Sequence, residues 1–212
     1  MKANLSNPKE DLQAIREFME RSSKFLSLSG LSGIFAGLCA LIGAAFAWFV
    51  ILGSGSLFYD EYLCSVGASP FNQVTISLTI DAIIVLGTAI LGAFYFSCRK
   101  ARKSGQKLWT SSTRRLLWHL SIPLVAGGVF VMILIFRNSV DLVASATLVF
   151  YGLALVNAGK FTLGEIHYLG LTEILLGILA GIFVSHGLLF WTLGFGLMHI
   201  VYGTVMYYRH ER

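Results

Sequence analysis

The stretch at residues 74–98 reads VTISLTIDAIIVLGTAILGAFYFSC and is followed directly by RKARK at residues 99–103. Asp81 is the only charged side chain in this apolar stretch. About 20 apolar residues in a helix are enough to cross the roughly 30 Å of hydrocarbon in a bilayer. The stretch is therefore predicted to be a transmembrane helix, and the basic run after it indicates a cytoplasmic loop.

The composition of the whole chain agrees with a membrane protein. Of its 212 residues, 56% are hydrophobic and 13% are charged, and the mean hydropathy is +0.73. Soluble domains carry about 25% charged residues. The net charge of +5 does not indicate nucleic-acid binding, because the basic residues lie in the short connections between apolar blocks.

The other apolar blocks have lengths similar to the first. The sequence predicts an all-α polytopic membrane helical bundle, whose transmembrane domain of six helices covers residues 25–212. The predicted spans are 25–52, 74–98, 116–136, 139–157, 162–184 and 188–207. Before them, residues 1–24 are predicted to form a short amphipathic helix at the cytoplasmic interface, because their apolar side chains share one helical face.

The basic residues also predict the orientation. With both termini in the cytoplasm, every lysine and arginine except Arg137 falls on the inner side. Residues 45–47 match the small-x-small pattern of a signal-peptide cleavage site, but the apolar run continues past them. We therefore expect the first span to be retained.

Local motifs predict details of two helices. Pro123 lies inside the third span and has no N–H to donate to the His119 carbonyl, so a kink is expected there. Thr162 and Glu165 have the spacing of a capping box, which predicts that the fifth helix begins at Thr162.

Small residues recur at helical spacing in two spans. Gly33 and Gly37 form a GxxxG pair in the first span, with Gly30 before them, and Gly177 and Gly181 form another in the fifth. Such faces allow close approach of helices in lipid. The sequence leaves open whether the approaching helix belongs to the same chain, to a second copy or to another membrane protein.

Ionisable side chains inside the spans are the candidate functional residues, because each is costly in lipid. Glu173 and His199 are each roughly 10–12 Å from the inner surface at a rise of 1.5 Å per residue, so they are level in the last hairpin. Asp81 lies roughly 10 Å below the outer surface. Asp141, close to that surface, is expected to be a first-turn carboxylate favoured by the helix dipole.

The level positions of Glu173 and His199 allow two interpretations. In one, the pair handles protons or cations in a small transporter or ion-permeation protein, with Asp81 at the outer end of the path. In the other, it is a structural clamp in a non-catalytic scaffold or accessory subunit, whose glycine faces pack against other helices. The sequence alone does not choose between them.

Motifs for other chemistry are not found. The five histidines have no HExxH spacing, the three cysteines have no CxxC spacing, and no nucleophile elbow or phosphate-binding loop is present. The sequence therefore predicts no metal site and no cofactor, and it leaves open whether the protein is an enzyme, with no motif in favour.

The basic residues from Arg99 to Arg115 suggest one further partner besides the bilayer itself. They could bind anionic lipid headgroups at the inner surface. Setting the topology is by itself a sufficient explanation of their charge.

The last quarter of the chain carries a resemblance. GKFTLGEIHYLG at 159–170, GLLFW at 187–191 and GFGLMH at 194–199 resemble a group of uncharacterised small six-span bacterial inner-membrane proteins. The resemblance implies a location in the bacterial inner membrane and no particular activity.

Overall fold

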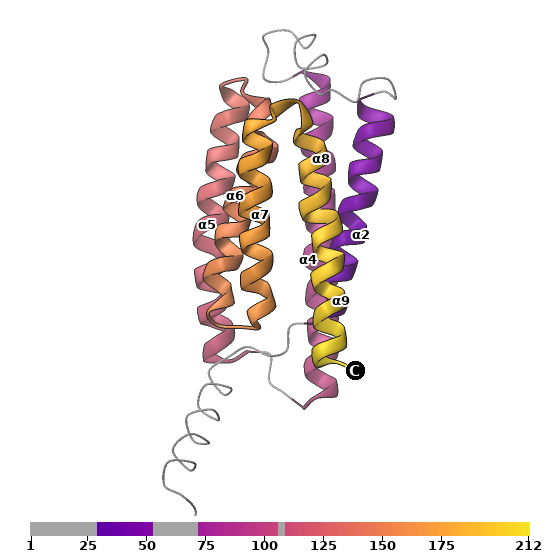
Figure 1. Cartoon of the computed structure of the whole chain (residues 1–212), viewed down its shortest axis with the longest axis vertical. Helices are drawn as coiled ribbons and strands as arrows, with labels where there is room; N and C mark the ends of the chain where they lie inside the picture. The colour runs from indigo at the N-terminus through magenta and orange to yellow at the C-terminus, as the bar shows by residue number, and fades with distance from the viewer. Residues whose placement is uncertain (1–28, 53–71, 106–108) are drawn as a thin grey trace, which may run out of the picture.

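The computed structural model describes residues 29–52, 72–105 and 109–212 and is helical throughout, without strands in those ranges (Figure 1). Within them, six helical stretches are long and apolar enough to cross a membrane. These are Gly30–Ile51, Gln73–Lys103, Ser111–Phe136, Val140–Gly159, Gly164–Ile182 and Val184–His210. The interfacial helix predicted within residues 1–24 lies outside the described residues.

Several of the six stretches contain more than one kind of helix. The first is α2 (Gly30–Phe46) continued by a π-helix, η1 (Ala47–Ile51), and the second and third are α4 (Gln73–Lys103) and α5 (Ser111–Phe136). A 3₁₀ turn, η2 (Val140–Leu142), leads into α6 (Val143–Gly159), and α7 (Gly164–Ile182) follows. The last stretch consists of η3 (Val184–His186), α8 (Gly187–Trp191), the π-helix η4 (Thr192–Met198) and α9 (His199–His210).

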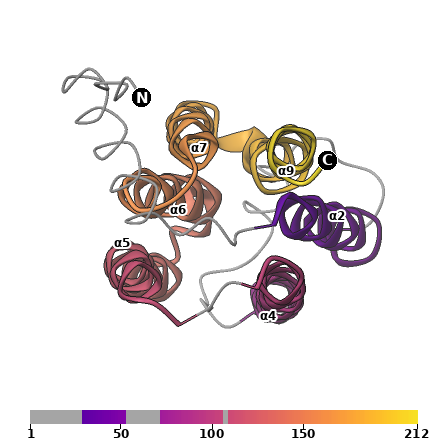
Figure 2. The ribbon, with the colours of Figure 1, turned by 90° about the horizontal axis from the view of Figure 1, so that it is seen from below.

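The helices form two groups of three that meet along the last stretch. In one group α6 packs against α5 and α7, and in the other α2 packs against α4 and α9. Figure 2 shows this arrangement from the end of the bundle, with α5, α6 and α7 on one side. The groups are joined where α8 and η4 contact α6 and α7.

Side chains cap the N-termini of two helices. The Asn72 Oδ1 atom accepts hydrogen bonds from the N–H groups of Val74 and Thr75, at 3.0 and 2.8 Å, at the start of α4. Thr110 and Thr113 form a capping box at the start of α5. These caps satisfy N–H groups that have no partner within the helix.

The helix start predicted at Thr162 is wrong, because α7 begins at Gly164 and its N-cap residue is Leu163, whose side chain makes no cap hydrogen bond. The capping box between Thr162 and Glu165 stays a prediction. The Glu165 carboxylate accepts a hydrogen bond from Arg209 Nη1 at 2.9 Å. In the third span α5 continues through Pro123 as one helix, and the kink expected there stays a prediction.

Glycines lie where helices approach most closely. A Cβ on Gly33 would lie 3.1 Å from the Cα atom of Gly203, and one on Gly37 would lie 2.6 Å from the Gly196 carbonyl oxygen. Gly30 faces the backbone of the same helix, α9. This face of α2 is therefore filled by the last stretch of the same chain.

The glycines of α7 face α6. A Cβ on Gly177 would meet Val149 at 2.7 Å, and one on Gly181 would lie 2.9 Å from the Ser145 Oγ atom. The Ser145 hydroxyl also donates a hydrogen bond to the Gly177 carbonyl at 2.7 Å. Both GxxxG faces thus have a partner helix within the chain.

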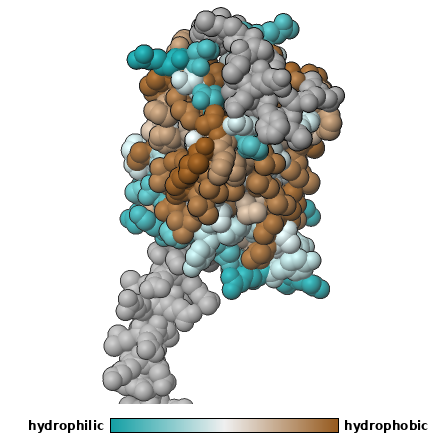
Figure 3. All heavy atoms as spheres, turned by 45° about the horizontal axis from the view of Figure 1, so that its top comes forward, coloured by the Kyte–Doolittle hydropathy of each residue, from teal (hydrophilic) through white to brown (hydrophobic). Residues whose placement is uncertain are grey.

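The outside of the bundle is apolar along its length. Figure 3 shows a hydrophobic surface between hydrophilic regions at the two ends. Large apolar side chains of α4 and α5 are open to the surroundings, including Leu91 at 70% and Val125 at 66% exposure. Such a surface is what lipid tails cover in a membrane protein.

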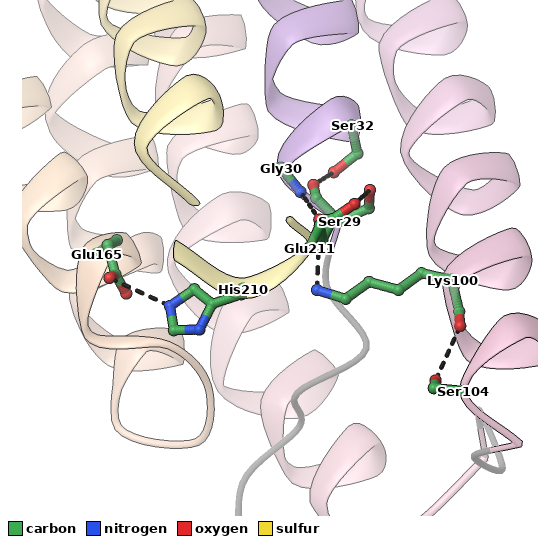
Figure 4. Close-up of polar contacts among 8 residues, drawn as sticks. All are labelled: Ser29, Gly30, Ser32, Lys100, Ser104, Glu165, His210 and Glu211. Atoms are coloured by element: carbon green, nitrogen blue, oxygen red, sulfur yellow. Dashed lines mark hydrogen bonds and ion pairs between the residues drawn. The ribbon is translucent and has the colours of Figure 1, made fainter. Parts of the chain in front are cut away.

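The C-terminal segment ties helices together at the end of the bundle where the chain ends (Figure 4). Glu211 Oε2 accepts a hydrogen bond from Ser29 Oγ at 3.0 Å, and Oε1 accepts one from the N–H of Gly30. Lys100 Nζ lies 3.3 Å from the same Oε1 atom. One carboxylate therefore joins α9 to the start of α2 and to α4.

Candidate functional site

Glu173 lies on the inward stripe of α7, together with Ile166, Leu169, Gly170, Gly177 and Ala180. Its side chain is fully buried, at 0% exposure. Neither carboxyl oxygen has a hydrogen-bond partner among the described residues. A buried carboxyl group without partners is costly when ionised, so its surroundings decide what it can do.

His199 begins α9 and is also buried, at 6% exposure. Its Nδ1 atom lies 3.4 Å from Oε1 of Glu173, which is close enough for an ion pair when the ring is protonated. The same Nδ1 atom lies 3.1 Å from the carbonyl oxygen of Gly194, and a ring N–H there would donate to that carbonyl. In this arrangement the Glu173 carboxyl has an electrostatic neighbour but no hydrogen bond.

Tyr151 on α6 contacts the other side of the imidazole ring. Its hydroxyl oxygen lies 2.8 Å from Nε2 of His199. With the proton on Nδ1, the ring accepts at Nε2, and the tyrosine hydroxyl is the donor. The structure therefore brings Glu173, His199 and Tyr151 into one row.

Aromatic rings surround the histidine. The ring of Phe195 is stacked on that of His199 at 5.9 Å between centroids and lies 5.0 Å from that of Tyr151. Trp191 lies 5.0 Å from Phe195 in turn. The stacked ring of Phe195 therefore restricts the position of the imidazole.

The π-helix η4 brings the backbone close to the acid. A Cβ on Gly194 would overlap with Oε2 of Glu173 and would lie 2.5 Å from Leu148 Cδ2, so only glycine fits there without movement. π-Helices are rare, and they occur frequently at functional sites. His199 follows η4 directly, which turns its ring back toward the Gly194 carbonyl.

No protein-family model, curated protein or solved structure matches this chain. Its function is therefore inferred from the chemistry of Glu173, His199 and Tyr151.

An apolar cluster lies next to this row of groups. The buried side chains of Leu155, Leu163, Ile166, Leu169 and Met206 form the cluster. Tyr151 and Met198 pack against it. Leu163 lies next to the start of α7 and Met206 lies near the end of α9, and both are close to the end of the bundle where the chain's C-terminus lies. The cluster therefore lies between the row and that end of the bundle.

Asp81 is placed elsewhere. It lies on α4 and faces Gly43 of α2, where a Cβ on the glycine would be 3.5 Å from its Oδ2 atom. Within the described residues, no hydrogen bond or ion pair joins Asp81 to Glu173 or His199. The aspartate therefore belongs to the group of α2, α4 and α9, away from the row.

The described residues contain no cluster of three or more histidine, cysteine, aspartate or glutamate side chains that could hold a metal ion. His119 is stacked on Phe161 at 4.7 Å between ring centroids, and His210 lies 3.3 Å from the Glu165 carboxylate. Each of these histidines has a local neighbour that accounts for its place.

Tyr151 was missed by reasoning from the sequence. It is uncharged and sits among apolar residues, so no cost of burying charge marks it. One signal was present in the sequence. Gly194 and Gly196 lie close together in the last span, which indicates a close approach of the backbone to a neighbouring helix or side chain there.

Proposed function

We propose that this protein is a small proton-coupled transporter or proton-permeation protein of the bacterial inner membrane, in which Glu173 and His199 take up and release protons. The observation that carries the proposal is the Glu173 carboxyl group, fully buried and without a hydrogen-bond partner among the described residues, 3.4 Å from His199 Nδ1. A purely structural polar group would be expected to have its hydrogen bonds made. The missing hydrogen bonds therefore favour the interpretation that Glu173 binds and releases a proton.

The two side chains can share one proton at little electrostatic cost. When the proton is on Glu173, the acid and the imidazole are both neutral. When it is on His199, the two charges face each other across 3.4 Å. Neither state leaves an isolated charge within the apolar bundle, which is the condition that makes ionisable groups tolerable there.

The imidazole can also pass a proton on, because its two nitrogens face different partners. Nδ1 faces Glu173 and the Gly194 carbonyl, and Nε2 faces the Tyr151 hydroxyl at 2.8 Å. In the tautomer with its proton on Nε2, the ring can accept the Glu173 proton at Nδ1 and then release the Nε2 proton to the Tyr151 oxygen, while the tyrosine hydroxyl gives its own proton to the next acceptor. We infer the order Glu173, His199, Tyr151 for the path, and Asp81 is not part of it.

The row also spans the meeting point of the two helix groups. Tyr151 and Glu173 belong to the group of α5, α6 and α7, whereas His199 belongs to α9, which packs against α2. A relative movement of the groups would therefore make or break both contacts of the imidazole. Such a link between protonation and helix movement is what a proton-coupled transporter requires.

The orientation we propose places both termini in the cytoplasm. It is supported by the basic side chains of the described residues, which lie at the ends of α4, α5, α6 and α9 that share one end of the bundle, with Arg137 at the other (Figure 1). Lysine and arginine are enriched on the cytoplasmic side of membrane proteins.

A scaffold or accessory subunit is the alternative function. The glycine faces of α2 and α7 are already filled by α9 and α6 of the same chain. Gly87 on α4 and Gly128 on α5 have no neighbouring atom within 4 Å of an added Cβ. A partner helix that packs against these open glycines would approach α4 or α5, and crosslinking in the native membrane would detect it.

Proton flux through the full-length protein tests the proposal. The protein would be reconstituted in liposomes that contain a pH-sensitive dye, and a potassium diffusion potential set with valinomycin would drive protons inward. We expect acidification faster than in empty liposomes, with Glu173→Gln and His199→Ala returning the rate to that of empty liposomes. Asp141→Asn is the matched control, because it removes a carboxylate near a helix end and leaves the row intact.

Two results would overturn the proposal. One is a wild-type rate equal to that of empty liposomes both with and without candidate small solutes on the outside. The other is a protein-dependent flux that Glu173→Gln leaves unchanged while the variant is folded by its melting profile in detergent.

A further inference from the structure

A groove of about 620 Å³ runs along α5 from the end of the helix that follows Thr110. Its lining changes in character along the helix. Trp109, Arg114 and Arg115 line one end. The other end is lined mainly by Leu117, Leu120 and Leu124, with Trp118, His119 and Ser121 among them. We call this feature the α5 groove.

Among the described residues, the charged end of the groove has no counterion. Arg114 and Arg115 are exposed, no acidic residue is present in the first turn of α5, and no salt bridge links either arginine to a described residue. Two adjacent guanidinium groups without a carboxylate attract an anion, and their planar N–H groups suit phosphate oxygens. The N–H group of Thr113 is already capped by the Thr110 hydroxyl, and the two arginine side chains supply the charged donors of the groove.

The apolar end reaches well into the depth of a bilayer. From Arg114 to Leu124 the helix rises about 15 Å at 1.5 Å per residue. This is about half of the roughly 30 Å hydrocarbon core, which is the thickness of one leaflet. The groove therefore has a cationic end and an apolar wall with the length of a lipid tail.

The indole rings fix the level of the charged end. The Trp109 and Trp118 side chains are 74% and 68% exposed. Exposed tryptophan is typical of the boundary between headgroups and hydrocarbon in membrane proteins. Arg114 and Arg115 are thus placed at the level of lipid phosphates.

From this arrangement we propose that the α5 groove is a binding site for one anionic phospholipid. Its phosphate binds Arg114 and Arg115, and one of its acyl chains lies along Leu117, Leu120 and Leu124. The assignment does not depend on proton transport, because the α5 groove includes none of the groups in the Glu173 row.

Lipid retention by the full-length protein tests the site. The protein would be purified in mild detergent, mixed with dioleoylphosphatidylglycerol or with dioleoylphosphatidylcholine, and examined by native mass spectrometry. We expect one phosphatidylglycerol to be retained, with retention lowered about tenfold in Arg114→Gln/Arg115→Gln. Arg102→Gln/Lys103→Gln is the matched control, since it removes the same charge from exposed positions at the end of α4.

Two further arms keep the test decisive. Leu124→Trp narrows the apolar end without a change of charge, and we expect it to weaken retention while the melting temperature without lipid is unchanged. Inorganic phosphate, added at a hundredfold excess, should not displace the lipid if the acyl chain contributes. Equal loss of phosphatidylglycerol in the two double variants would show attraction by surface charge only. Displacement of the lipid by phosphate would show a site for anions only. Either result overturns the proposal.

Discussion

Gly194 lies directly against the carboxyl group of Glu173, so that a Cβ on residue 194 would overlap with the Oε2 atom. The contact joins the π-helix η4 to the inward stripe of α7. It also explains how His199, five residues further on, comes to face both the acid and the Gly194 carbonyl.

Gly194→Ala should therefore disturb the site without removing any ionisable group. Either the carboxyl or η4 has to move, and we expect a loss of stability of about 1–3 kcal/mol, as is typical of overpacking, together with a reduced proton flux. Gly128→Ala is the control, because the same change on α5 meets no atom within 4 Å. Thermal unfolding in detergent would measure the difference, and a wild-type melting temperature for Gly194→Ala would contradict the close contact.

Tyr151→Phe should separate hydrogen bonding from packing. The ring would keep its contact with Phe195, whereas the hydroxyl that lies 2.8 Å from His199 Nε2 would be lost. We expect a stability loss of about 1 kcal/mol and a several-fold slower proton flux with a changed pH profile.

Tyr202→Phe serves as the comparison for Tyr151, since the described residues give the Tyr202 hydroxyl no hydrogen bond. Flux would be recorded in liposomes over a range of pH for both variants. If Tyr151→Phe and the wild type had the same dependence of proton flux on pH, the tyrosine would not belong to the path, which would then consist of Glu173 and His199.

Glu211→Ala should destabilise the bundle although it lies next to the C-terminal residue. Its carboxylate accepts hydrogen bonds from Ser29 and Gly30 and pairs with Lys100, and its side chain is only 12% exposed. Removal takes away the acceptor of the Ser29 hydroxyl and of the Gly30 N–H group, which costs about 1–3 kcal/mol.

Arg209→Ala gives the contrast at the same end. Arg209 pairs with Glu165 at 2.9 Å, but its side chain is 69% exposed, and exposed ion pairs contribute about 0–1 kcal/mol. Chemical or thermal unfolding of both variants in one detergent would compare them. If the two variants lost similar amounts of unfolding free energy, the contact of Glu211 with three helices would not stabilise the bundle more than an exposed ion pair does.

Cysteine labelling should report the orientation of the bundle. Arg137→Cys and Arg212→Cys would each be introduced after Cys39, Cys64 and Cys98 have been replaced by alanine. With both termini in the cytoplasm, an impermeant maleimide should label residue 137 from outside and residue 212 only in inside-out vesicles. The reverse pattern would contradict the charge-based topology.

The long apolar spans were predictable because length and hydropathy are local properties. The stretch at 74–98 lies within the described helix Gln73–Lys103, and the run at 116–136 lies within Ser111–Phe136. The start of the fifth helix was predicted two residues too early, since α7 begins at Gly164 and not at Thr162. The ends of helices depend on contacts with residues far away in the chain, such as the hydrogen bond from Arg209 to Glu165 in the first turn of α7.

The candidate site divides in the same way. By itself the sequence determined the number of helices long enough to span a bilayer and the equal depth of Glu173 and His199, because depth follows from the rise per residue along a short hairpin. Only the tertiary structure decided that Tyr151 completes the row, that Asp81 lies apart from it and that Glu211 joins three helices. The physical reason is that helices in lipid are apolar on nearly all sides, so the sequence does not show which face turns inward until the helices have packed.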